Sequence, residues 1–468
     1  MMRGPVEMTG LLRKKSGPGG ARAVPTRGVT TVQTHFRFLG SRYAAFAKLL
    51  KLARVCMFTT TLATGTAALS VSGARAGGYD TPILYSAGHM GLGGAAIAYV
   101  DDPSAMFHNP AGLMGTKGLT LMLNATLILG SITASPTEFN PNEDSEGLTA
   151  LAPLVGVSLD YNDVVAFGVA FFPVASAGGE YLYTDAGSQV ATRNFTSVKF
   201  LELSPGVAFK IPGTGLSIGA GYRIDFVTLG RYLGPQKSAD GSPTFDVEMK
   251  GTNFTGFRVG LQWQPIKELQ LGLVFRSHTR TTIEDPAGVV LLPDERKVET
   301  DFVLPAKLGF GARVNIDPVA LVLDLEYGLY SQNRKSTFKA DPELPITIQN
   351  VFDWSNALTL RAGVEYGYLG HWFFRGGFMY DGQVSNEQYP SAFGTPPTST
   401  ITLTAGVGYK HGDDWKLNFA FAQRFGSTKV ERGTPDQTCL PCSANGDYSL
   451  TMSGLYLDFT YAFPHIFD

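Results

Sequence analysis

The sequence predicts an all-β protein: a 14-stranded antiparallel transmembrane β-barrel with a small N-terminal hatch, or plug, inside the lumen. Three observations carry this prediction. Charged residues make up only 17% of the 468 residues, against about 25% in an average soluble domain. No internal stretch of about 20 apolar residues offers a membrane-spanning helix. From Gly118 onward, alternating apolar and polar segments are joined by alternately short and long connections.

The first 76 residues are typical of an export leader. Three basic residues between 48 and 54 precede the apolar run 55–71, and Ala74-Arg75-Ala76 places small residues at both key positions of a cleavage site. We expect cleavage after Ala76 and export from the cytoplasm. The basic stretch before Lys48 is long for a signal peptide, so it is either a start assigned too far upstream or a functional extension.

The hatch is expected at 77–118, and its central part, 91–113, is rich in Gly and Ala. This part ends in an Asn-Pro-Ala-Gly turn that begins at Asn109. Asn and Pro favour turns, and Gly permits close approach of another backbone. A Gly-rich surface loop would have the same composition, but the barrel pattern that follows favours a compact insert. Asp101 and Asp102 are candidate anchors to arginines in the lumen.

The barrel is expected at 119–463, with a short tail at 464–468. In GLSIGAGYRIDF (215–226), for example, every second residue from Leu216 is apolar, and small or polar residues lie between. Six short turns and seven longer loops give fourteen strands, and short turns with long outer loops are typical of outer-membrane barrels. A soluble sandwich also alternates, but its strands are usually shorter. The longer loops are expected at 134–148, 184–192, 232–243, 285–297, 331–349, 382–398 and 431–448.

The polar face of the strands carries charges of both signs. Mixed signs indicate ion pairs between strands inside the barrel, whereas an ion-selective pore would more readily show rings of one sign. The expected cations are Lys307, Arg313, Arg361, Arg375 and Arg424, and the expected anions are Glu202, Asp225, Asp324, Glu326 and Glu365.

The third strand, 164–183, breaks its own pattern. Pro173 lacks a ladder donor and Gly178-Gly179 permits a bend, so we expect regular pairing to be interrupted between them. In lipid, such a break is tolerated where it lines a cavity or is covered by protein. The break is therefore either a bulge without function or an opening in the wall.

Cys439 and Cys442 lie in a polar loop, TCLPCSANG. In an oxidising compartment such a pair is expected to form a disulfide. Metal binding would need further ligands nearby, and redox catalysis would need a thioredoxin-like context that is missing. We therefore expect a loop disulfide, and neither a metal nor a cofactor.

The plug with its Asn-Pro-Ala turn, the broken third strand ending in Gly-Gly-Glu-Tyr and a last strand closing on Tyr-Ala-Phe resemble the FadL/TodX family of outer-membrane transporters of hydrophobic substrates. The resemblance covers 77–463. It implies a hatch, capture of substrate by the third and fourth outer loops, an apolar pocket and sideways exit at the strand kink. Carried over by position, the hatch motif is Asn109, Pro110 and Ala111, and the lateral opening comprises Phe172, Pro173, Gly178 and Gly179.

The expected function is passive uptake of hydrophobic molecules, most readily long-chain fatty acids. Aromatic hydrocarbon uptake by the same route, a general porin and a structural barrel are the alternatives. An outer-membrane enzyme is disfavoured because the histidines of the mature chain form no recognisable Ser/His arrangement. A net charge of −2 indicates no nucleic-acid partner. The expected partners are the hydrophobic substrate, outer-membrane lipid and the barrel-assembly machinery, which is expected to recognise the aromatic-ended last strand, and the barrel is expected to be a monomer.

Overall fold

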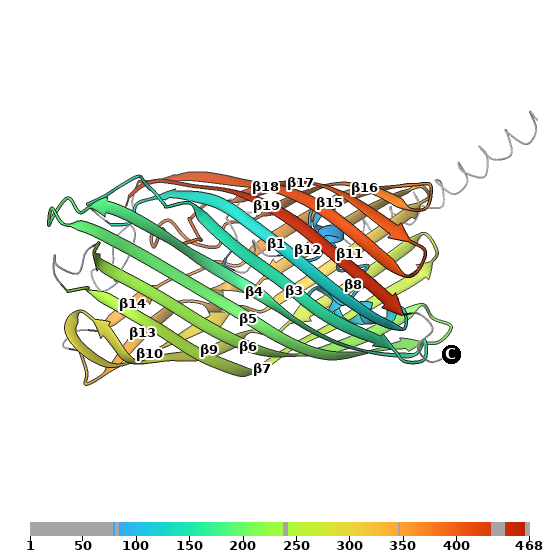
Figure 1. Cartoon of the computed structure of the whole chain (residues 1–468), viewed down its shortest axis with the longest axis horizontal. Helices are drawn as coiled ribbons and strands as arrows, with labels where there is room; N and C mark the ends of the chain where they lie inside the picture. Colours follow the sequence, from blue (N-terminus) through green and yellow to red (C-terminus); the bar gives the residue numbers. More distant parts are fainter. Residues whose placement is uncertain are drawn as a thin grey trace, which may run out of the picture. The chain divides into compact units, whose positions relative to one another are not determined.

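The chain forms a closed antiparallel barrel of 14 wall strands (Figure 1), as the sequence predicts. The computed structural model describes residues 78–79, 84–137, 139–236, 242–344, 347–431 and 445–463. The expected leader, the Cys439–Cys442 pair and the tail lie outside the described residues. In the part of the chain that is described, no helix is long and apolar enough to cross a membrane.

The first half of the wall is made of long strands that pair with their neighbours in chain order. The barrel closes where the first strand pairs with the last, from Leu119 opposite Phe463 to Thr133 opposite Ser449. The strands of this first half are β1 (Leu119–Ala134), β3 (Leu148–Asp160), β4 (Val165–Thr184), β5 (Ala191–Ile211), β6 (Leu216–Pro235) and β7 (Phe245–Ile266). The short β2 (Glu143–Asp144) pairs with the end of β1.

Four wall strands in the second half are each interrupted once. These four interruptions, together with the short β2, which is not a separate wall strand, are why the nineteen strand elements of the described residues make fourteen wall strands. The four interrupted strands are β9 with β8, β10 with β11, β12 with β13, and β14 with β15. The elements are β8 (Leu269–Arg276), β9 (Thr279–Val290), β10 (Leu292–Leu304), β11 (Lys307–Ile316), β12 (Val319–Gly328), η3 (Tyr330–Gln332), β13 (Lys335–Asp341), β14 (Ile348–Val351), β15 (Ala357–Tyr368), β16 (Trp372–Asp381), β17 (Thr400–His411), β18 (Trp415–Val430) and β19 (Gly446–Phe463).

The alternation along the strands separates a lipid-facing surface from the lumen. In β1, Met122 is buried while Leu121 and Leu123 are exposed, and the same alternation recurs around the wall. A strand has a side-chain period of two, so one face can be apolar throughout. The exposed face is therefore the apolar one, as expected of a barrel wall in a membrane, and the polar residues between point inward.

The connections have the expected lengths with two corrections. The expected loop at 331–349 contains the strand β13 and the first residues of β14, which pair with each other. The six short turns join strands where the sequence places them, but the expected polar loop at 285–297 is a tight hairpin. Here β9 continues to Val290, β10 begins at Leu292, and Leu291 forms the tip with φ +60°. The ladder includes Arg296 opposite Gly288. Outside the lipid a strand needs no apolar face, so its polar composition resembles that of a loop.

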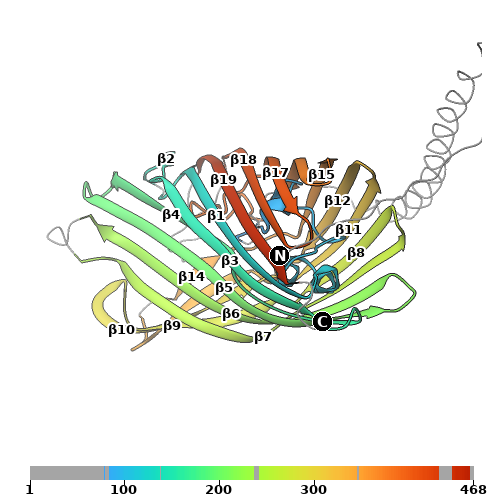
Figure 2. The ribbon, with the colours of Figure 1, turned by 45° about the vertical axis from the view of Figure 1, so that its right-hand side comes forward.

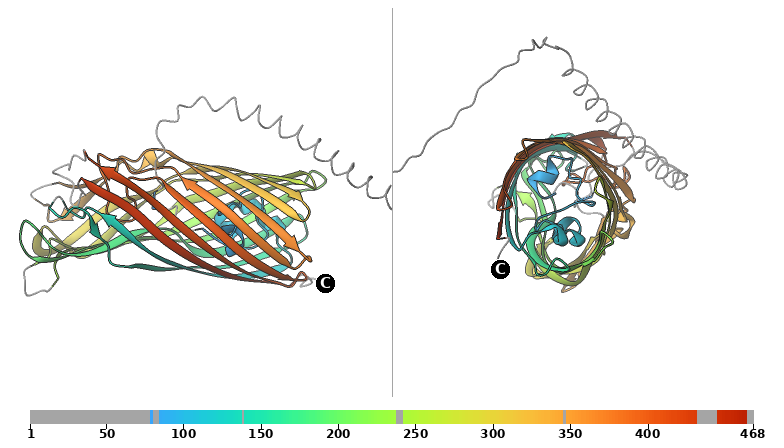
Figure 3. Two further views of the ribbon diagram at one scale, coloured as in Figure 1. Left: turned by 90° about the horizontal axis from the view of Figure 1, so that it is seen from above. Right: turned by 90° about the vertical axis from the view of Figure 1, so that its right-hand side faces the viewer.

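The segment 84–116, which the sequence assigns to the hatch, contains three short helical turns. These are α2 (Ala87–Met90), α3 (Ala105–His108) and η1 (Pro110–Gly115). Viewed along the barrel axis, they lie inside the ring of strands (Figure 3), and Figure 2 shows the same blue and teal elements from the side. The segment contacts strands on several sides of the ring, with η1 against β5 and β6 and α2 against β17 and β18. The hatch sequence therefore packs on the lumen face of the wall.

Candidate functional site

Asn109 connects the hatch segment with itself and with the wall. It is fully buried. Its side-chain amide donates to the backbone oxygens of Ile97 at 2.8 Å and of Leu261 in β7 at 3.0 Å, and its Oδ1 accepts from Ala111 N at 3.1 Å. Pro110 then occupies the first position of η1, where a missing N–H removes no helical hydrogen bond. The Asn-Pro-Ala turn is thus a docking element as well as a turn.

Two inward-facing glycines of the wall make room for this turn. A Cβ on Gly260 in β7 would collide with Asn109 Oδ1, and a Cβ on Gly219 in β6 would collide with the backbone of Pro110 and Ala111. Both positions belong to the alternating small or polar face of their strands. Glycine is therefore required there by close backbone approach.

Wall carboxylates hold further parts of the hatch segment. Asp324 Oδ2 accepts from Ala96 N at 2.7 Å and from Ile97 N at 3.0 Å. Asp101 pairs with Lys416 of β18, a lysine rather than the arginine that the sequence suggested. Within the part of the chain that the structure describes, Asp102 has no ion pair with a wall arginine; its Oδ1 accepts from Ser104 N within the segment. Of the two anchors expected from sequence, only Asp101 reaches the wall.

The expected ion pairs between strands are present in the lumen. Glu326 contacts Lys307 at 2.9 Å and Arg361 at 3.3 Å, and Glu365 contacts Arg313 at 2.6 Å and Arg375 at 2.7 Å. Each of the two glutamates therefore bridges two cations on different strands. Such pairs satisfy charges that would otherwise be expensive to bury.

A second buried cluster includes two arginines that sequence reasoning missed. Glu202 in β5 accepts from Arg223 Nε at 2.6 Å and from Arg258 Nη1 at 3.0 Å, and all three side chains are buried. Asp225 completes the cluster at 3.3 Å from Arg223. Arg258 Nη1 also donates to the backbone oxygen of Met106 in the hatch segment. The cluster therefore joins three wall strands to the hatch.

The irregularity expected in the third strand lies in β4. Its pairing with β5 shifts by one residue between Pro173 and Ala175, which makes Val174 a bulge. Before the bulge Phe167, Val169 and Phe171 face outward, whereas after it Tyr181 and Tyr183 face inward. A one-residue insertion reverses the faces of a strand. Gly178 and Gly179, in contrast, pair regularly with β5.

The larger break is on the other edge of β4. Pairing with β3 ends at Val155 opposite Phe171, although β3 stays paired with β1 up to Leu148. Beyond the break, Glu146 N donates to Glu180 O at 2.7 Å. Residues 148–154 of β3 and 172–179 of β4 thus share no ladder pairs, and we call this region the β3–β4 gap.

Each side of the β3–β4 gap contains a proline, Pro153 in β3 and Pro173 in β4. Proline has no N–H to leave unpaired, so it suits a strand edge without a neighbour. Pro153 was missed from the sequence because its neighbours alternate regularly, and only the pairing of β3 shows its position.

The hatch segment touches the kink directly. The Tyr85 hydroxyl donates to Pro173 O at 2.9 Å. The ring of Phe107 packs edge-on against Phe172, with centroids 5.4 Å apart, and against Tyr85 at 5.1 Å. Phe172 itself is fully buried. The bulge and the hatch therefore share one aromatic cluster.

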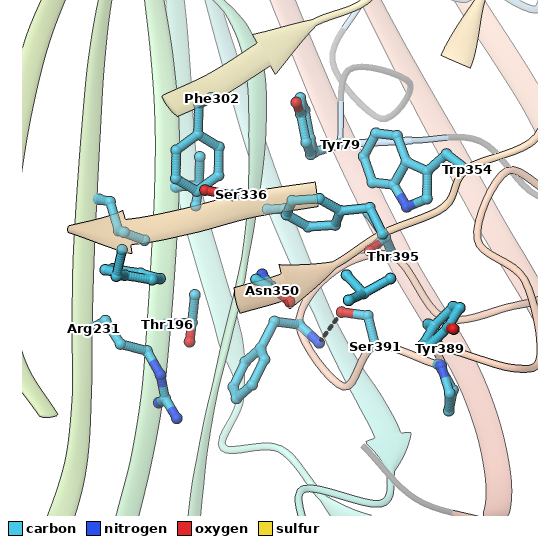
Figure 4. Close-up of a pocket in the computed structure, with 18 of the residues that line it drawn as sticks. Tyr79, Thr196, Arg231, Phe302, Ser336, Asn350, Trp354, Tyr389, Ser391 and Thr395 are labelled. Atoms are coloured by element: carbon cyan, nitrogen blue, oxygen red, sulfur yellow. Dashed lines mark hydrogen bonds between the residues drawn. The ribbon is translucent and has the colours of Figure 1, made fainter. Parts of the chain in front are cut away.

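An apolar pocket is lined by Tyr79, by residues of several wall strands and by the sixth outer loop (Figure 4). Eight of its nineteen lining residues are aromatic, and two of these belong to the sixth outer loop, 382–398. The ring of Tyr79 stacks on Phe200 at 5.2 Å and lies 4.8 Å from the ring of Trp354. Other lining residues are Val198, Leu229, Phe245, Phe302, Phe338, Phe352 and Phe393.

Arg231 of β6 brings one cation to this pocket (Figure 4). Its side chain is buried, and Nη1 donates to Asn194 Oδ1 at 2.6 Å and to the backbone oxygens of Phe195 and Tyr232 at 2.7 Å. Among the described residues, Nε and Nη2 have no hydrogen-bond partner. Its guanidinium lies 5.4 Å from the ring centroid of Phe393. Sequence reasoning missed Arg231, because one arginine on an alternating strand gives no signal of its partners.

The described part of the chain holds no group of three or more His, Cys, Asp or Glu side chains arranged for a metal ion. The expected third capture loop falls partly on residues outside the description, between β6 and β7, and the expected fourth is the hairpin at Leu291. The pocket, the hatch segment and the β3–β4 gap are the features of the described chain that bear on function.

Solved structures of low sequence identity share this fold. A FadL homologue from Pseudomonas aeruginosa is 18% identical, with a TM-score of 0.67 over 83% of this chain and 100% of that chain. The toluene transporter TodX from Pseudomonas putida is 16% identical (TM-score 0.62, 84% and 100%). The toluene transporter TbuX from Ralstonia pickettii is 18% identical (TM-score 0.57, 81% and 98%). No curated protein matches the sequence.

The family assignment comes from the sequence match and agrees with this fold. The model of the family described as outer membrane protein transport protein (OMPP1/FadL/TodX) matches residues 68–463. This range includes the described hatch segment and the whole barrel wall. The chain therefore belongs to the OMPP1/FadL/TodX family of transport proteins and is a β-barrel of the outer membrane.

Proposed function

We propose that this barrel takes up long-chain fatty acids passively, holding the acyl chain in the apolar pocket and releasing it sideways through the β3–β4 gap. The observation that carries the choice of substrate is Arg231. A buried guanidinium that keeps Nε and Nη2 unpartnered in an apolar pocket is matched by a carboxylate, which accepts two parallel hydrogen bonds from one edge of the group.

A neutral hydrocarbon would leave this cation unsatisfied. An unpaired buried donor costs about 1–3 kcal/mol, and more when it is charged. The aromatic lining from Phe302, Phe352 and Trp354 supports the second candidate, an aromatic hydrocarbon, because such rings stack on arenes. The two candidates differ in the group that faces Arg231.

Two arguments support lateral release: the interrupted pairing of β4 with β3, and the free-energy cost of releasing an apolar substrate into an aqueous lumen. Each methylene gains about 0.8 kcal/mol from leaving water, so release into an aqueous lumen would return that free energy. The β3–β4 gap lacks ladder bonds that would have to break, and a proline on each side reduces the number of unpaired donors. The hatch segment, in this proposal, closes the periplasmic end and directs substrate sideways.

Binding to purified barrel tests the substrate class. We expect oleate to bind at least about tenfold more tightly than oleyl alcohol or toluene, a difference of about 1.4 kcal/mol. Arg231→Met should abolish this preference while keeping affinity for oleyl alcohol. Arg280→Met, which removes an exposed arginine paired with Asp301, is the control and should keep it. Equal affinity of the wild type for toluene and oleate would favour the arene instead.

Uptake by cells tests the route. Pro173→Val with Gly179→Ala should favour a regular β4 edge and reduce uptake of labelled oleate. Gly178 is retained because a Cβ there would lie 2.6 Å from Thr196 O. Pro205→Val, which changes a proline inside the regular β4–β5 ladder, is the control. Unchanged uptake in a variant whose β3 and β4 are shown to pair would require axial release.

A further inference from the structure

The sixth outer loop folds against the inner side of β4 at the β3–β4 gap. The Tyr181 hydroxyl of β4 donates to Ala392 O at 2.7 Å, and Ala392 is fully buried. A Cβ built on Gly179 would lie 3.6 Å from both Ala392 O and Phe393 Cδ1. The backbone of this loop therefore lies on the part of β4 that has no partner in β3.

Gly394 allows this close approach. Its φ is +77°, and a Cβ there would lie 2.8 Å from Ala177 Cβ and 2.9 Å from Gly178 N. A side chain would be disfavoured by the backbone conformation and by contact with β4. The loop is shaped to rest on β4 rather than to project into solvent.

Phe393 belongs to both the pocket and the gap. The guanidinium carbon of Arg231 lies 5.4 Å from the centroid of the Phe393 ring. The ring of Tyr181 packs edge-on against the same ring, with centroids 5.8 Å apart. Tyr389, Ser391 and Thr395 of the same loop also line the pocket (Figure 4). One short stretch thus separates the proposed carboxylate position from the unpaired edge of β4.

This stretch is held by side-chain bonds rather than by a strand ladder. Ser391 Oγ accepts from Phe393 N at 3.2 Å, and Ser385 Oγ donates to Thr395 O at 2.7 Å at the base of the loop. Residues 389–395 have no strand structure. A few such bonds are exchanged more easily than a ladder, and segments that move in function are drawn from the less stable parts of a fold.

We propose that residues 389–395 form an inner gate over the β3–β4 gap, which must leave β4 before a molecule in the pocket can reach the gap, with Phe393 as the residue that a ligand on Arg231 displaces. This inference rests on the proposed uptake function and adds the element that regulates its lateral step. It predicts that fixing the loop to β4 stops transfer without preventing entry into the pocket.

The test is a reversible crosslink between loop and wall. Gly179→Cys with Ala392→Cys is made in a Cys439→Ser, Cys442→Ser background, so that the outer-loop cysteines cannot interfere. Because Gly179 lies in the β3–β4 gap, the reference is the uptake of the same variant by cells before oxidation. Oxidation should reduce this uptake of labelled oleate about tenfold or more, and a reductant should restore it to the same reference. Purified oxidised protein should still bind oleate. Phe393→Ala, which shortens the gate without a crosslink, should speed uptake.

The control is Ser176→Cys with Lys199→Cys, which joins opposite residues of β4 and β5 near the same position without touching the loop. Its uptake should not change on oxidation. Equal uptake by the oxidised and reduced gate variant, or an equal loss in the control, overturns the gate. Absence of oleate uptake by the reduced variant and the wild type alike contradicts the proposed function itself, so the two failures are distinguished.

Discussion

The hatch region and the pocket region of the lumen differ in how their buried charged groups are paired. Around the hatch segment, Glu202 and Glu326 each hold two cations, and Asp324 holds two backbone N–H groups. In the pocket, Arg231 lies among aromatic rings with two of its nitrogens unpartnered among the described residues. In the hatch region these carboxylates face cations or backbone N–H groups, whereas in the pocket region no ion pair joins Arg231 to an anion among the described residues. In the proposed function, the carboxylate of the fatty acid supplies that anion.

This difference in pairing separates buried charges that stabilise the folded structure from a buried charge that is available to pair with a ligand. A buried ion pair adds little net stability, but removing one partner is costly because the other charge stays buried. Removing a cation that has no anionic partner leaves no unpaired charge behind. The same substitution, arginine to methionine, should therefore have different effects in the two regions.

The largest expected effect is the loss of Arg258. Arg258→Met leaves Glu202 with one of its two arginines and removes the donor to Met106 O, so we expect a loss of about 3 kcal/mol in the free energy of unfolding. Arg231→Met should cost less, about 1 kcal/mol, because it leaves no unpaired charge behind and removes only the neutral acceptors Asn194 Oδ1, Phe195 O and Tyr232 O from their donor. Urea unfolding in detergent, followed by tryptophan fluorescence, measures both. Equal destabilisation by the two substitutions would remove the distinction between the regions.

A smaller effect is expected from crowding the hatch motif. Gly260→Ala places a methyl group against Asn109 Oδ1, and we expect overpacking of about 1–3 kcal/mol that loosens the hatch. The readout is the reaction of a cysteine at Ala95 with a bulky external thiol reagent. Ala95 is buried, so labelling should be slow in the parent and faster with Gly260→Ala. Gly376→Ala is the matched control, because nothing lies within 4 Å of a Cβ at Gly376. Fast labelling of the parent would contradict the hatch assignment.

The barrel could be predicted because its signal is repeated around the wall. Period-two alternation is imposed by lipid on one side and lumen on the other, and short turns mark one end. The hairpin at Leu291 was missed where the strands leave the lipid and this constraint ends. The prediction therefore fails where the environment no longer selects the apolar face.

The site was predictable only where one local residue type determines the geometry. The Asn-Pro-Ala turn and Pro173 could be found because Asn and Pro restrict the backbone by themselves. The partners of Arg231 and Arg258 depend on the register of neighbouring strands and on contacts distant in sequence, such as Arg258 with Met106. The β3–β4 gap depends on where a ladder stops, which neither strand shows alone.

At neutral pH the smallest effect is expected from the two histidines of the hatch region, because their influence on stability appears only as the pH falls. His89 and His108 of the hatch segment are buried with their rings 5.4 Å apart. Burial lowers the pKa of both, and for His108 the neighbouring His89, Arg361 and Arg258 lower it further. The carboxylates of Asp101 and Asp102 raise the pKa of His89, and the carboxylate of Glu326 raises the pKa of His108, without outweighing burial.

The direction of the pH effect follows from which state binds more protons. In the unfolded chain these histidines take up a proton near pH 6.5, whereas in the folded hatch they remain neutral to lower pH. Stability should therefore fall as the pH drops below about 6.5, by at most about 1.4 kcal/mol per pH unit for each histidine, until the folded pKa is reached. His108→Phe keeps an aromatic ring and should reduce this slope, while His411→Phe, at an exposed turn, should not. Unfolding midpoints at pH 7.5 and 5.0 measure the slope, and an unchanged slope in His108→Phe would show that the hatch is not the acid-sensitive part of the lumen.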